Sequence, residues 1–418
     1  MTGDLVIVGA SVAGVTLART LRSRGFTGRV RLVDREAEEP YDKPPLSKGR
    51  PAEPVRLLTR PEAERLGLEL LLGAEATGVD PAARRLALAD GSRLGYGALV
   101  IATGVRARPS PWPGPGVHTL RTLADARALH AGLARGGHLV VIGAGFIGAE
   151  AAGTATALGC RVTLVDPLPS PPARVVGRSV GNRILAWHVR AGVDLRLGRG
   201  VQALDHRADG IMVRLDDGEV LRADHVLVGI GAEPDVDWLA GSGLHLDDGI
   251  ACDRYGRALG VDHVYAAGDI ACWATADGAA GRRIEHWTSA QEQARCVAAT
   301  LLDPGRPQAP GEVPMVWSDQ HGRTIQVLGA VDPAVEPRIV ADEGRLLALW
   351  GGGRVVGAVS LAWPRASLAA RRAIASGAPI TEVLDALTRQ KTPPRTDTPP
   401  RTETAPLKET ASLKEVAR

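Results

Sequence analysis

A strand–glycine-turn–helix unit occurs twice in this chain, and each copy sharply limits how its part of the sequence can fold. The first copy spans residues 5–14 and the second spans residues 139–148. In both, a short apolar run typical of a strand in a buried parallel sheet leads into closely spaced glycines. The glycines permit a tight turn and let the backbone approach a pyrophosphate, which the N-terminus of the following helix stabilises. Two copies predict two bound dinucleotides held face to face, as a flavin enzyme reduced by a nicotinamide requires.

The first copy reads G-x-S-x-x-G, with serine at the middle position, and the second matches G-x-G-x-x-G in full. The loop residues expected to bind the two dinucleotides are Gly9, Ser11, Ala13, Gly14, Gly143, Gly145, Ile147 and Gly148.

An acidic residue ends the strand that follows each loop, Asp34 in the first copy and Asp166 in the second. A carboxylate about 20 residues after the glycines accepts hydrogen bonds from the adenosine ribose. At Asp166 it would also repel a 2′-phosphate, and neither Arg161 nor Arg174 obviously builds a phosphate site. We therefore expect NADH rather than NADPH at the second loop.

Composition limits the other classes of function. The chain has 418 residues, enough for two or three domains, and a net charge of +3, which gives no reason to expect a nucleic-acid partner. No apolar run approaches the length of a membrane span. The cysteines show no close pairing, which argues against a metal site or a disulfide scaffold and suits the reducing cytoplasm. They are Cys160, Cys252, Cys272 and Cys296.

The rest of the chain continues the duplication. The strand-to-glycine runs 98–104 and 226–231 are alike, so Thr103, Gly104 and Gly231 are expected at turns beside the cofactors. Residues 308–390 alternate short apolar runs with turns and predict a small α+β domain. Residues 391–418 repeat a Pro/Thr/charged pattern that cannot bury a core, and we expect a disordered tail there.

Four further motifs, in order along the chain, resemble the FAD-dependent ferredoxin reductases. They are Tyr-Asp-Lys-Pro-Pro-Leu-Ser-Lys at 41–48, Gly-Asp at 268–269, Glu-His-Trp at 285–287 and Trp-Ser-Asp-Gln at 317–320. These flavoproteins pass electrons from NADH to small iron–sulfur proteins that serve cytochrome P450s or Rieske oxygenases. The resemblance covers residues 3 to about 388.

The resemblance implies an α/β fold with two Rossmann-like dinucleotide-binding domains and a C-terminal α+β domain. The FAD-binding domain would comprise residues 1–108 and 228–307, the inserted NAD-binding domain residues 109–227, and the C-terminal domain residues 308–390.

The resemblance also implies cofactor-binding residues outside the glycine loops. The adenosine ribose of FAD would be bound by Asp34 or Glu36, and the residues leave this choice open. The other cofactor-binding residues would be Lys43, Pro45, Lys48, Glu150, Asp269, Glu285, Trp287 and Trp317. Lys43 departs from the arginine usual in the family and lacks its bidentate fork, so this contact with FAD is expected to be weaker.

Lys48 and Glu150 are the residues expected to act in catalysis. In related enzymes a lysine at the first position lies near flavin N5 and pairs with a glutamate that follows the second glycine motif. A fixed cation there stabilises negative charge as hydride arrives.

No cysteine precedes Cys160, so a redox disulfide or a reactive cysteine near residues 43–48 is excluded. Electrons are expected to leave the flavin directly for an external carrier, a small acidic ferredoxin. Arg282-Arg283 and Arg371-Arg372 could supply a basic docking surface. We expect a monomer or a homodimer.

Two other functions remain open on the sequence. The same cofactor motifs would serve a flavin-dependent NADH oxidase or reductase acting on oxygen, a quinone or a biosynthetic small molecule. They would also serve a non-enzymatic interaction protein in which bound nucleotide controls dimerisation.

Overall fold

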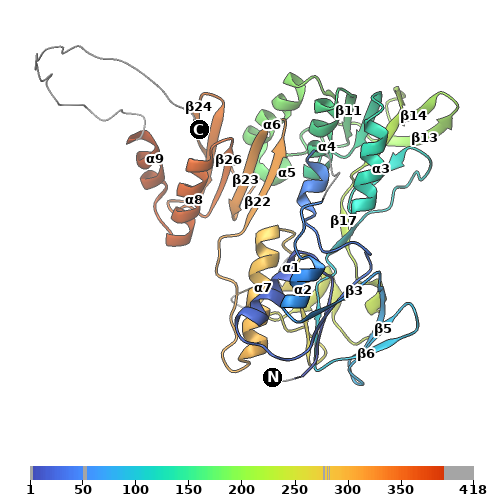
Figure 1. Cartoon of the computed structure of the whole chain (residues 1–418). Coiled ribbons are helices and arrows are strands. Elements are labelled where there is room, and N and C mark those ends of the chain that lie inside the picture. The colour runs from blue at the N-terminus through green and yellow to red at the C-terminus, as the bar shows by residue number, and fades with distance from the viewer. Residues whose placement is uncertain (1–2, 50–53, 276–277, 280, 282, 390–418) are drawn as a thin grey trace, which may run out of the picture.

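A computed structural model of the chain describes residues 3–49, 54–275, 278–279, 281 and 283–389. The predicted tail at 391–418 lies outside the described residues. Figure 1 shows three parts, with the first glycine loop in the lower part, the second in the upper part, and an antiparallel sheet with two helices beside the upper part. None of the helices in the described part of the chain is long and apolar enough to cross a membrane.

The lower part is built on a parallel sheet in the strand order β20-β7-β1-β2-β3. Its elements are β1 (Leu5–Val8), α1 (Val12–Ser23), β2 (Val30–Asp34), η1 (Pro44–Ser47), α2 (Arg60–Arg65), β3 (Leu68–Leu72), β4 (Ala76–Asp80), β5 (Arg85–Leu88), β6 (Arg93–Gly95), β7 (Ala98–Ile101), η2 (Asp237–Leu239), β18 (Leu246–Asp247), β19 (Gly249–Cys252), β20 (Val264–Ala266), β21 (Ala271–Trp273) and α7 (Trp287–Leu302). Strand β1 is buried along its whole length, which explains its unbroken apolar run. Helices α1 and α7 pack against each other beside the sheet.

The upper part repeats this plan with the strand order β12-β11-β10-β16-β9, again parallel. Its elements are β9 (Val117–His118), α3 (Leu123–Leu133), β10 (His138–Ile142), α4 (Phe146–Ala157), β11 (Arg161–Asp166), α5 (Ala173–Val176), α6 (Arg178–Arg190), β12 (Asp194–Leu197), β13 (Val201–Arg207), β14 (Gly210–Leu215), β15 (Val220–Ala223) and β16 (His225–Val228). The chain enters this part through β8 (Val105–Ala107) and returns through β17 (Ala232–Pro234), and these two strands pair antiparallel.

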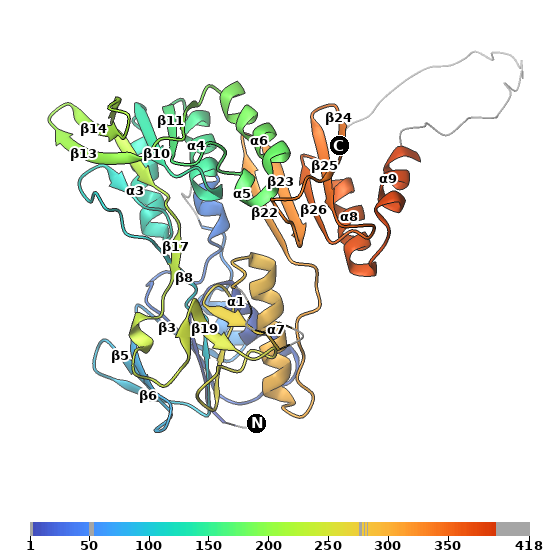
Figure 2. The ribbon, with the colours of Figure 1, turned by 180° about the vertical axis from the view of Figure 1, so that it is seen from behind.

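The third part is an antiparallel sheet in the order β22-β23-β26-β25-β24. Its elements are β22 (Met315–Gln320), β23 (Arg323–Gly329), β24 (Arg338–Asp342), β25 (Arg345–Trp350), β26 (Gly357–Leu361), α8 (Pro364–Ser376) and α9 (Ile380–Arg389). Figure 2 shows α8 and α9 on one side of this sheet and α5 and α6 on the other. The α6 residues Ile184 and Trp187 share a hydrophobic cluster with Ile325 and Trp350 of the sheet, which joins the second and third parts.

The first glycine of each loop has the same backbone conformation. Gly9 and Gly143 have φ angles of +103° and +102°. A Cβ atom at Gly9 would lie 2.3 Å from the carbonyl oxygen of Ala102, and one at Gly143 would lie 2.3 Å from that of Gly229. Any side chain is therefore both strained and excluded there, because a neighbouring strand end passes directly against the turn.

Candidate active site

Two adjoining cavities connect the three parts of the molecule. The first, about 270 Å³, lies at the end of β2 against the first glycine loop. The second, about 400 Å³, reaches the second loop, η1 and the first strand of the antiparallel sheet. Ser11, Lys43, Val105 and Arg121 line both. A long ligand could therefore extend from the first cavity into the second, at the carboxyl end of a parallel sheet.

The carboxylate of Asp34 accepts hydrogen bonds from the neighbouring backbone. Its Oδ2 accepts a hydrogen bond from the Ala10 N–H at 2.6 Å, and its Oδ1 accepts one from the Glu36 N–H at 2.9 Å. Burial raises the pKa of Asp34, and the two backbone hydrogen bonds oppose that change. The carboxylate thus stabilises the turn and lies at the wall of the first cavity.

Asp166 has the same role at the second loop. It accepts hydrogen bonds at 2.8 Å from the N–H groups of Ala144 and Leu168. Arg174, which the sequence did not connect with a binding site, lines the second cavity, and its Nη2 lies 3.5 Å from the position of a Cβ atom on Gly145. This guanidinium therefore stands beside the middle of the glycine loop.

Glu36 and Lys43 form an ion pair on the wall of the first cavity, with Nζ 2.6 Å from Oε1. Burial alone would raise the pKa of Glu36, but the ion pair and the hydrogen bonds from Lys43 and Tyr41 lower it. Burial lowers the pKa of Lys43, against the attraction of Glu36. The hydroxyl of Tyr41 also accepts a hydrogen bond from the N–H of Leu123 at 2.8 Å, which ties this pair to the start of α3.

Thr103 shows that the first cavity suits a polar ligand. Its Oγ1 is buried and has no hydrogen-bond partner among the described residues, although it lies on the cavity wall with Gly9 and Ser11. A buried hydroxyl without a partner is costly, and a phosphate or sugar oxygen would remove that cost. The residues present therefore fit the predicted FAD.

Asp269 lines the second cavity beside Arg121. Nη2 of Arg121 lies 3.7 Å from Oδ2 of Asp269. Burial raises the pKa of Asp269, and the charge of Arg121 partly offsets this rise. Arg121 lines both cavities and was not found in the sequence, since a single arginine in a loop carries no motif.

Arg283 is not free to bind a partner, contrary to the expectation for a docking residue. Its side chain is 9% exposed and pairs with Asp248 at 2.8 Å and with Glu285 at 2.7 Å. It also donates a hydrogen bond to the carbonyl oxygen of Asp269 at 2.8 Å. Arg283 therefore stabilises the turn that carries Asp269 and positions Glu285 at the second cavity.

Lys48 and Glu150 lie together at the second cavity, with Nζ 3.5 Å from Oε1. A second carboxylate, that of Asp319 on β22, is nearer to the lysine at 2.9 Å. Glu150 is buried and accepts hydrogen bonds from the hydroxyls of Ser47 and Ser318. Burial raises the pKa of Glu150, while Lys48 and these hydrogen bonds oppose the rise. This cluster joins η1, α4 and β22, one element from each of the three parts.

Trp287 and Trp317 make an edge-to-face contact on the wall of the same cavity, with ring centroids 6.0 Å apart. The Nε1–H of Trp287 donates to Oδ1 of Asp42 at 2.9 Å, and the Nζ of Lys48 lies 5.2 Å from the centroid of the Trp317 ring. The indoles are thus held in place by charged neighbours and present apolar surface to the cavity.

The other residues predicted for the site act through the backbone or through packing. Ala13 lies against the turn at Gly268. A Cβ atom placed on Gly268 would be 3.2 Å from the Cβ of Ala13. The carbonyl oxygen of Pro45 accepts a hydrogen bond from the N–H of Lys48 at 3.0 Å. Gly104 and Gly231 have positive φ angles at the ends of their strands, and Gly231 lines the second cavity.

Comparison with known proteins places the chain. Residues 3–294 match the family described as pyridine nucleotide-disulphide oxidoreductase, and residues 315–391 match the domain described as reductase C-terminal. Rhodocoxin reductase of Rhodococcus erythropolis is 36% identical over 399 residues, which cover 90% of this chain and 91% of that protein. A Burkholderia cepacia protein named as the ferredoxin–NAD(+) reductase component of an anthranilate 1,2-dioxygenase system is 37% identical and covers 90% of this chain and 96% of its own length.

Among solved structures, the covalent putidaredoxin reductase–putidaredoxin complex superposes with a TM-score of 0.84 at 30% identity, covering 92% of this chain and 99% of that one. These matches confirm the predicted α/β fold, the oxidoreductase class, and FAD and NADH as cofactors. The chain belongs to the pyridine nucleotide-disulphide oxidoreductase family, in the group of ferredoxin reductases that the motifs of the sequence predicted.

Proposed function

We propose that this protein takes electrons from NADH through FAD and passes them singly to a small iron–sulfur ferredoxin that supplies a Rieske oxygenase or a cytochrome P450. The observation that carries the proposal is the cluster of Lys48, Glu150 and Asp319, of which Lys48 and Glu150 line the cavity that both glycine loops approach. The names of the relatives support a ferredoxin as the acceptor, and the solved complex of a similar reductase with putidaredoxin supports direct contact with it.

The first cavity would hold the adenosine and pyrophosphate of FAD. Gly9, Ser11 and Thr103 would face the phosphates, and Glu36 would accept from the ribose hydroxyls. We assign the ribose to Glu36 rather than Asp34 because both carboxylate oxygens of Asp34 accept hydrogen bonds from the loop backbone, whereas the partners of Glu36 are the side chains of Lys43 and Tyr41, which can rearrange around a ligand.

When bound, FAD supplies the redox chemistry, since it accepts hydride from NADH and releases electrons one at a time. The protein supplies position and charge. Lys48 holds a positive charge in the cavity, and its two carboxylate partners fix its direction. Trp287 and Trp317 cover the cavity with apolar surface and exclude water from it.

The domain boundaries belong to the same proposal. Residues 1–108 and 228–307 would bind FAD, residues 109–227 would bind NADH, and residues 308–390 would form the C-terminal domain. The antiparallel pair β8–β17 supports these limits, because it carries the chain from one parallel sheet to the other and back. A cytoplasmic location is supported by the four cysteines, all of which are free thiols. We propose a monomer or a homodimer in solution.

NADH is proposed as the electron donor in preference to NADPH. Asp166 places a buried carboxylate at the end of β11, where a 2′-phosphate would meet a negative charge. Arg174 lies beside Gly145 and so faces the pyrophosphate region of the loop.

An anaerobic titration of the purified flavoprotein with NADH and then with NADPH tests both parts of the proposal. NADH should bleach the flavin absorbance, and a ferredoxin coupled to cytochrome c should then restore it rapidly, with slow reoxidation in air alone. Rapid reoxidation in air that ferredoxin does not accelerate would instead establish an oxidase. Equal activity with the two nucleotides would overturn the assignment of Asp166.

A further inference from the structure

We propose that Arg35, Asp235 and Arg106 form an ion-pair strap across the adenosine end of the first cavity, and that this strap slows the release of FAD. The inference rests on the proposed function, since it takes FAD as the ligand of that cavity. It concerns three residues to which neither the sequence motifs nor the family comparison gave a role.

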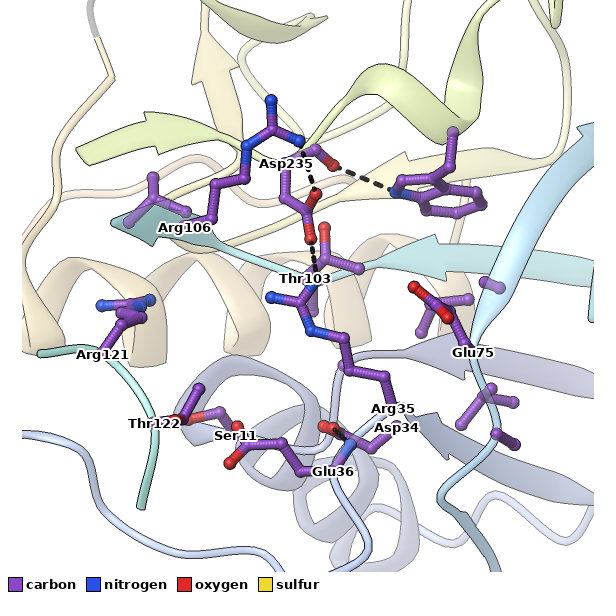
Figure 3. Close-up of a pocket in the computed structure, with 18 of the residues that line it drawn as sticks. Ser11, Asp34, Arg35, Glu36, Glu75, Thr103, Arg106, Arg121, Thr122 and Asp235 are labelled. Carbon is purple, nitrogen blue, oxygen red and sulfur yellow. Dashed lines mark hydrogen bonds and ion pairs between the residues drawn. The ribbon is translucent and has the colours of Figure 1, made fainter. Parts of the chain in front are cut away.

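The strap is made by two ion pairs on one carboxylate. Arg35 Nη1 lies 2.9 Å from Oδ2 of Asp235, and Arg106 Nη1 lies 3.6 Å from Oδ1. Figure 3 shows Arg35 reaching from the side of Asp34 and Glu36 to Asp235, with Arg106 on the opposite side. All of these residues line the cavity. The pair between Arg35 and Asp235 therefore joins two walls of the cavity where the adenosine would lie, and the pair with Arg106 holds Asp235 on its own wall.

The two ends of the strap come from different parts of the molecule. Arg35 follows directly on the last residue of β2, in the lower part. Asp235 follows β17 and Arg106 lies in β8, the two strands that connect the lower and upper parts. The ion pair between Arg35 and Asp235 thus links the first nucleotide-binding sheet to the connecting strands at the wall of the cavity.

Asp235 is mostly buried and hydrogen-bonded within its own segment, whereas the side chain of Arg35 is held by one ion pair. The Asp235 side chain is 13% exposed, and its carbonyl oxygen accepts a hydrogen bond from Nε1 of Trp238 at 3.0 Å. Arg106 is anchored independently, at 2.9 Å from Glu233 and through a contact with Asp237. Among the described residues, Arg35 forms one ion pair, that with Asp235. The Arg35 side chain is 45% exposed.

Partial exposure and a single ion pair suit Arg35 to controlling ligand release more than to stabilising the fold. A partly exposed ion pair adds little to the stability of the fold, and salt weakens it. It can still act on a ligand beneath it, because the ligand cannot leave until the pair opens, and such effects fall mainly on the dissociation rate.

The test measures how fast the FAD-loaded protein loses its cofactor, from the rise in free-flavin fluorescence in the presence of a trap for released FAD. Arg35→Gln should release FAD roughly three- to tenfold faster than wild type. The matched control is Arg127→Gln, which removes an ion pair with Glu38 at 3.1 Å between side chains of 51% and 33% exposure. Neither of those residues lines either of the two cavities described above, so this variant should release FAD at the wild-type rate.

A double-mutant cycle shows whether the ion pair is responsible. Asp235→Asn should also accelerate release, and the double variant should be no faster than Asp235→Asn, because that change already removes the pair with Arg35. Raising the salt concentration should narrow the difference between wild type and Arg35→Gln. Binding of FMN, which lacks the adenosine, should be equal in the two proteins.

Two outcomes overturn the strap. One is release at the wild-type rate from Arg35→Gln, and the other is an equal loss of affinity for FMN and FAD. Both differ from failure of the proposed function, in which the wild-type protein itself would neither retain nor rebind FAD.

Discussion

The two glycine loops begin on glycines of the same backbone conformation, but their surroundings differ. At each loop an aspartate at the end of the following strand accepts hydrogen bonds from the loop and from the residue two positions further on. That second residue is Glu36 at the first loop and Leu168 at the second. Around the first loop stand charged and hydrogen-bonding side chains, including Lys43 and Arg121. Around the second, Ile147, Leu168 and Ile230 are between 40% and 46% exposed.

We propose that this difference separates a cofactor that stays bound from one that exchanges. Polar groups that close over the first cavity must give up their contacts before the ligand can leave, which slows release. Exposed apolar side chains at the second loop offer a surface that a nucleotide can cover and uncover quickly. The motif therefore specifies that a dinucleotide binds, and the side chains around it set how long the dinucleotide remains.

The largest effect is expected from substitutions that fill one glycine loop at a time. A Cβ atom at Gly148 would lie 2.0 Å from the carbonyl oxygen of Gly143, and one at Gly14 would lie 2.0 Å from that of Gly9. Gly148→Val should lower the rate of flavin reduction by NADH roughly 100-fold while the protein stays yellow. Gly14→Val should yield protein without flavin. Stopped-flow absorbance and the flavin content of the purified variants distinguish these results, and loss of flavin from Gly148→Val would contradict the assignment of the loops.

The next largest effect is expected where the two nucleotide-binding parts meet, at Lys48. Lys48→Met removes the cation and leaves Glu150 buried without it, so reduction of the flavin by NADH should slow roughly 10- to 100-fold. Lys48→Arg keeps the charge and should recover part of the rate. Stopped-flow measurements over a range of NADH concentrations separate this effect from weaker binding. A change in NADH affinity alone would mean that Lys48 holds the nucleotide and does not assist the transfer.

Glu36→Gln should affect only the first loop. It removes a charged acceptor from the cavity and leaves the half-buried charge of Lys43 without its carboxylate partner, so affinity for FAD should fall about tenfold. Reconstitution of apoprotein with FAD, followed by fluorescence, measures this change, and the affinity of the loaded variant for NADH should not move. If Asp34→Asn weakened FAD binding more than Glu36→Gln, the ribose assignment would be wrong.

The smallest effect concerns the region of the second loop at acid pH. His188 on α6 donates to Oε1 of Gln320 at 3.0 Å and lies 2.9 Å from the ring of His321. Burial lowers the pKa of His188 to about 4, opposed by the hydrogen bond to Gln320. Its neutral form is favoured in the folded state, so stability is complete above the unfolded pKa near 6.5 and declines as the pH falls toward 4.

Between pH 6.5 and pH 5.5 the free energy of unfolding should therefore fall by about 1 kcal/mol from this group. Urea titrations at the two pH values measure the change, and His188→Gln should reduce it. The same pH dependence in wild type and variant would show that other groups cause the acid sensitivity.

The sequence by itself determined the features that depend on neighbouring residues. The apolar strands, the glycine spacing and the motif at residues 41–48 are local patterns, and they predicted the parallel sheets, the two dinucleotides and the family. The glycine spacing predicts the turns because the close backbone contacts at Gly9 and Gly143 exclude every larger residue. The absence of a cysteine before Cys160 excluded thiol relays in the same direct way.

Only the tertiary structure decided which distant side chains meet. Asp319 lies 271 residues from the Lys48 that it pairs with, and Asp235 lies 200 residues from Arg35. The tertiary structure also shows that Arg283 is buried in ion pairs and not at the surface. An ion pair forms when two charges come within a few ångströms. That distance is set by how whole sheets and helices pack, and single charged residues in loops leave no periodic pattern from which it could be read.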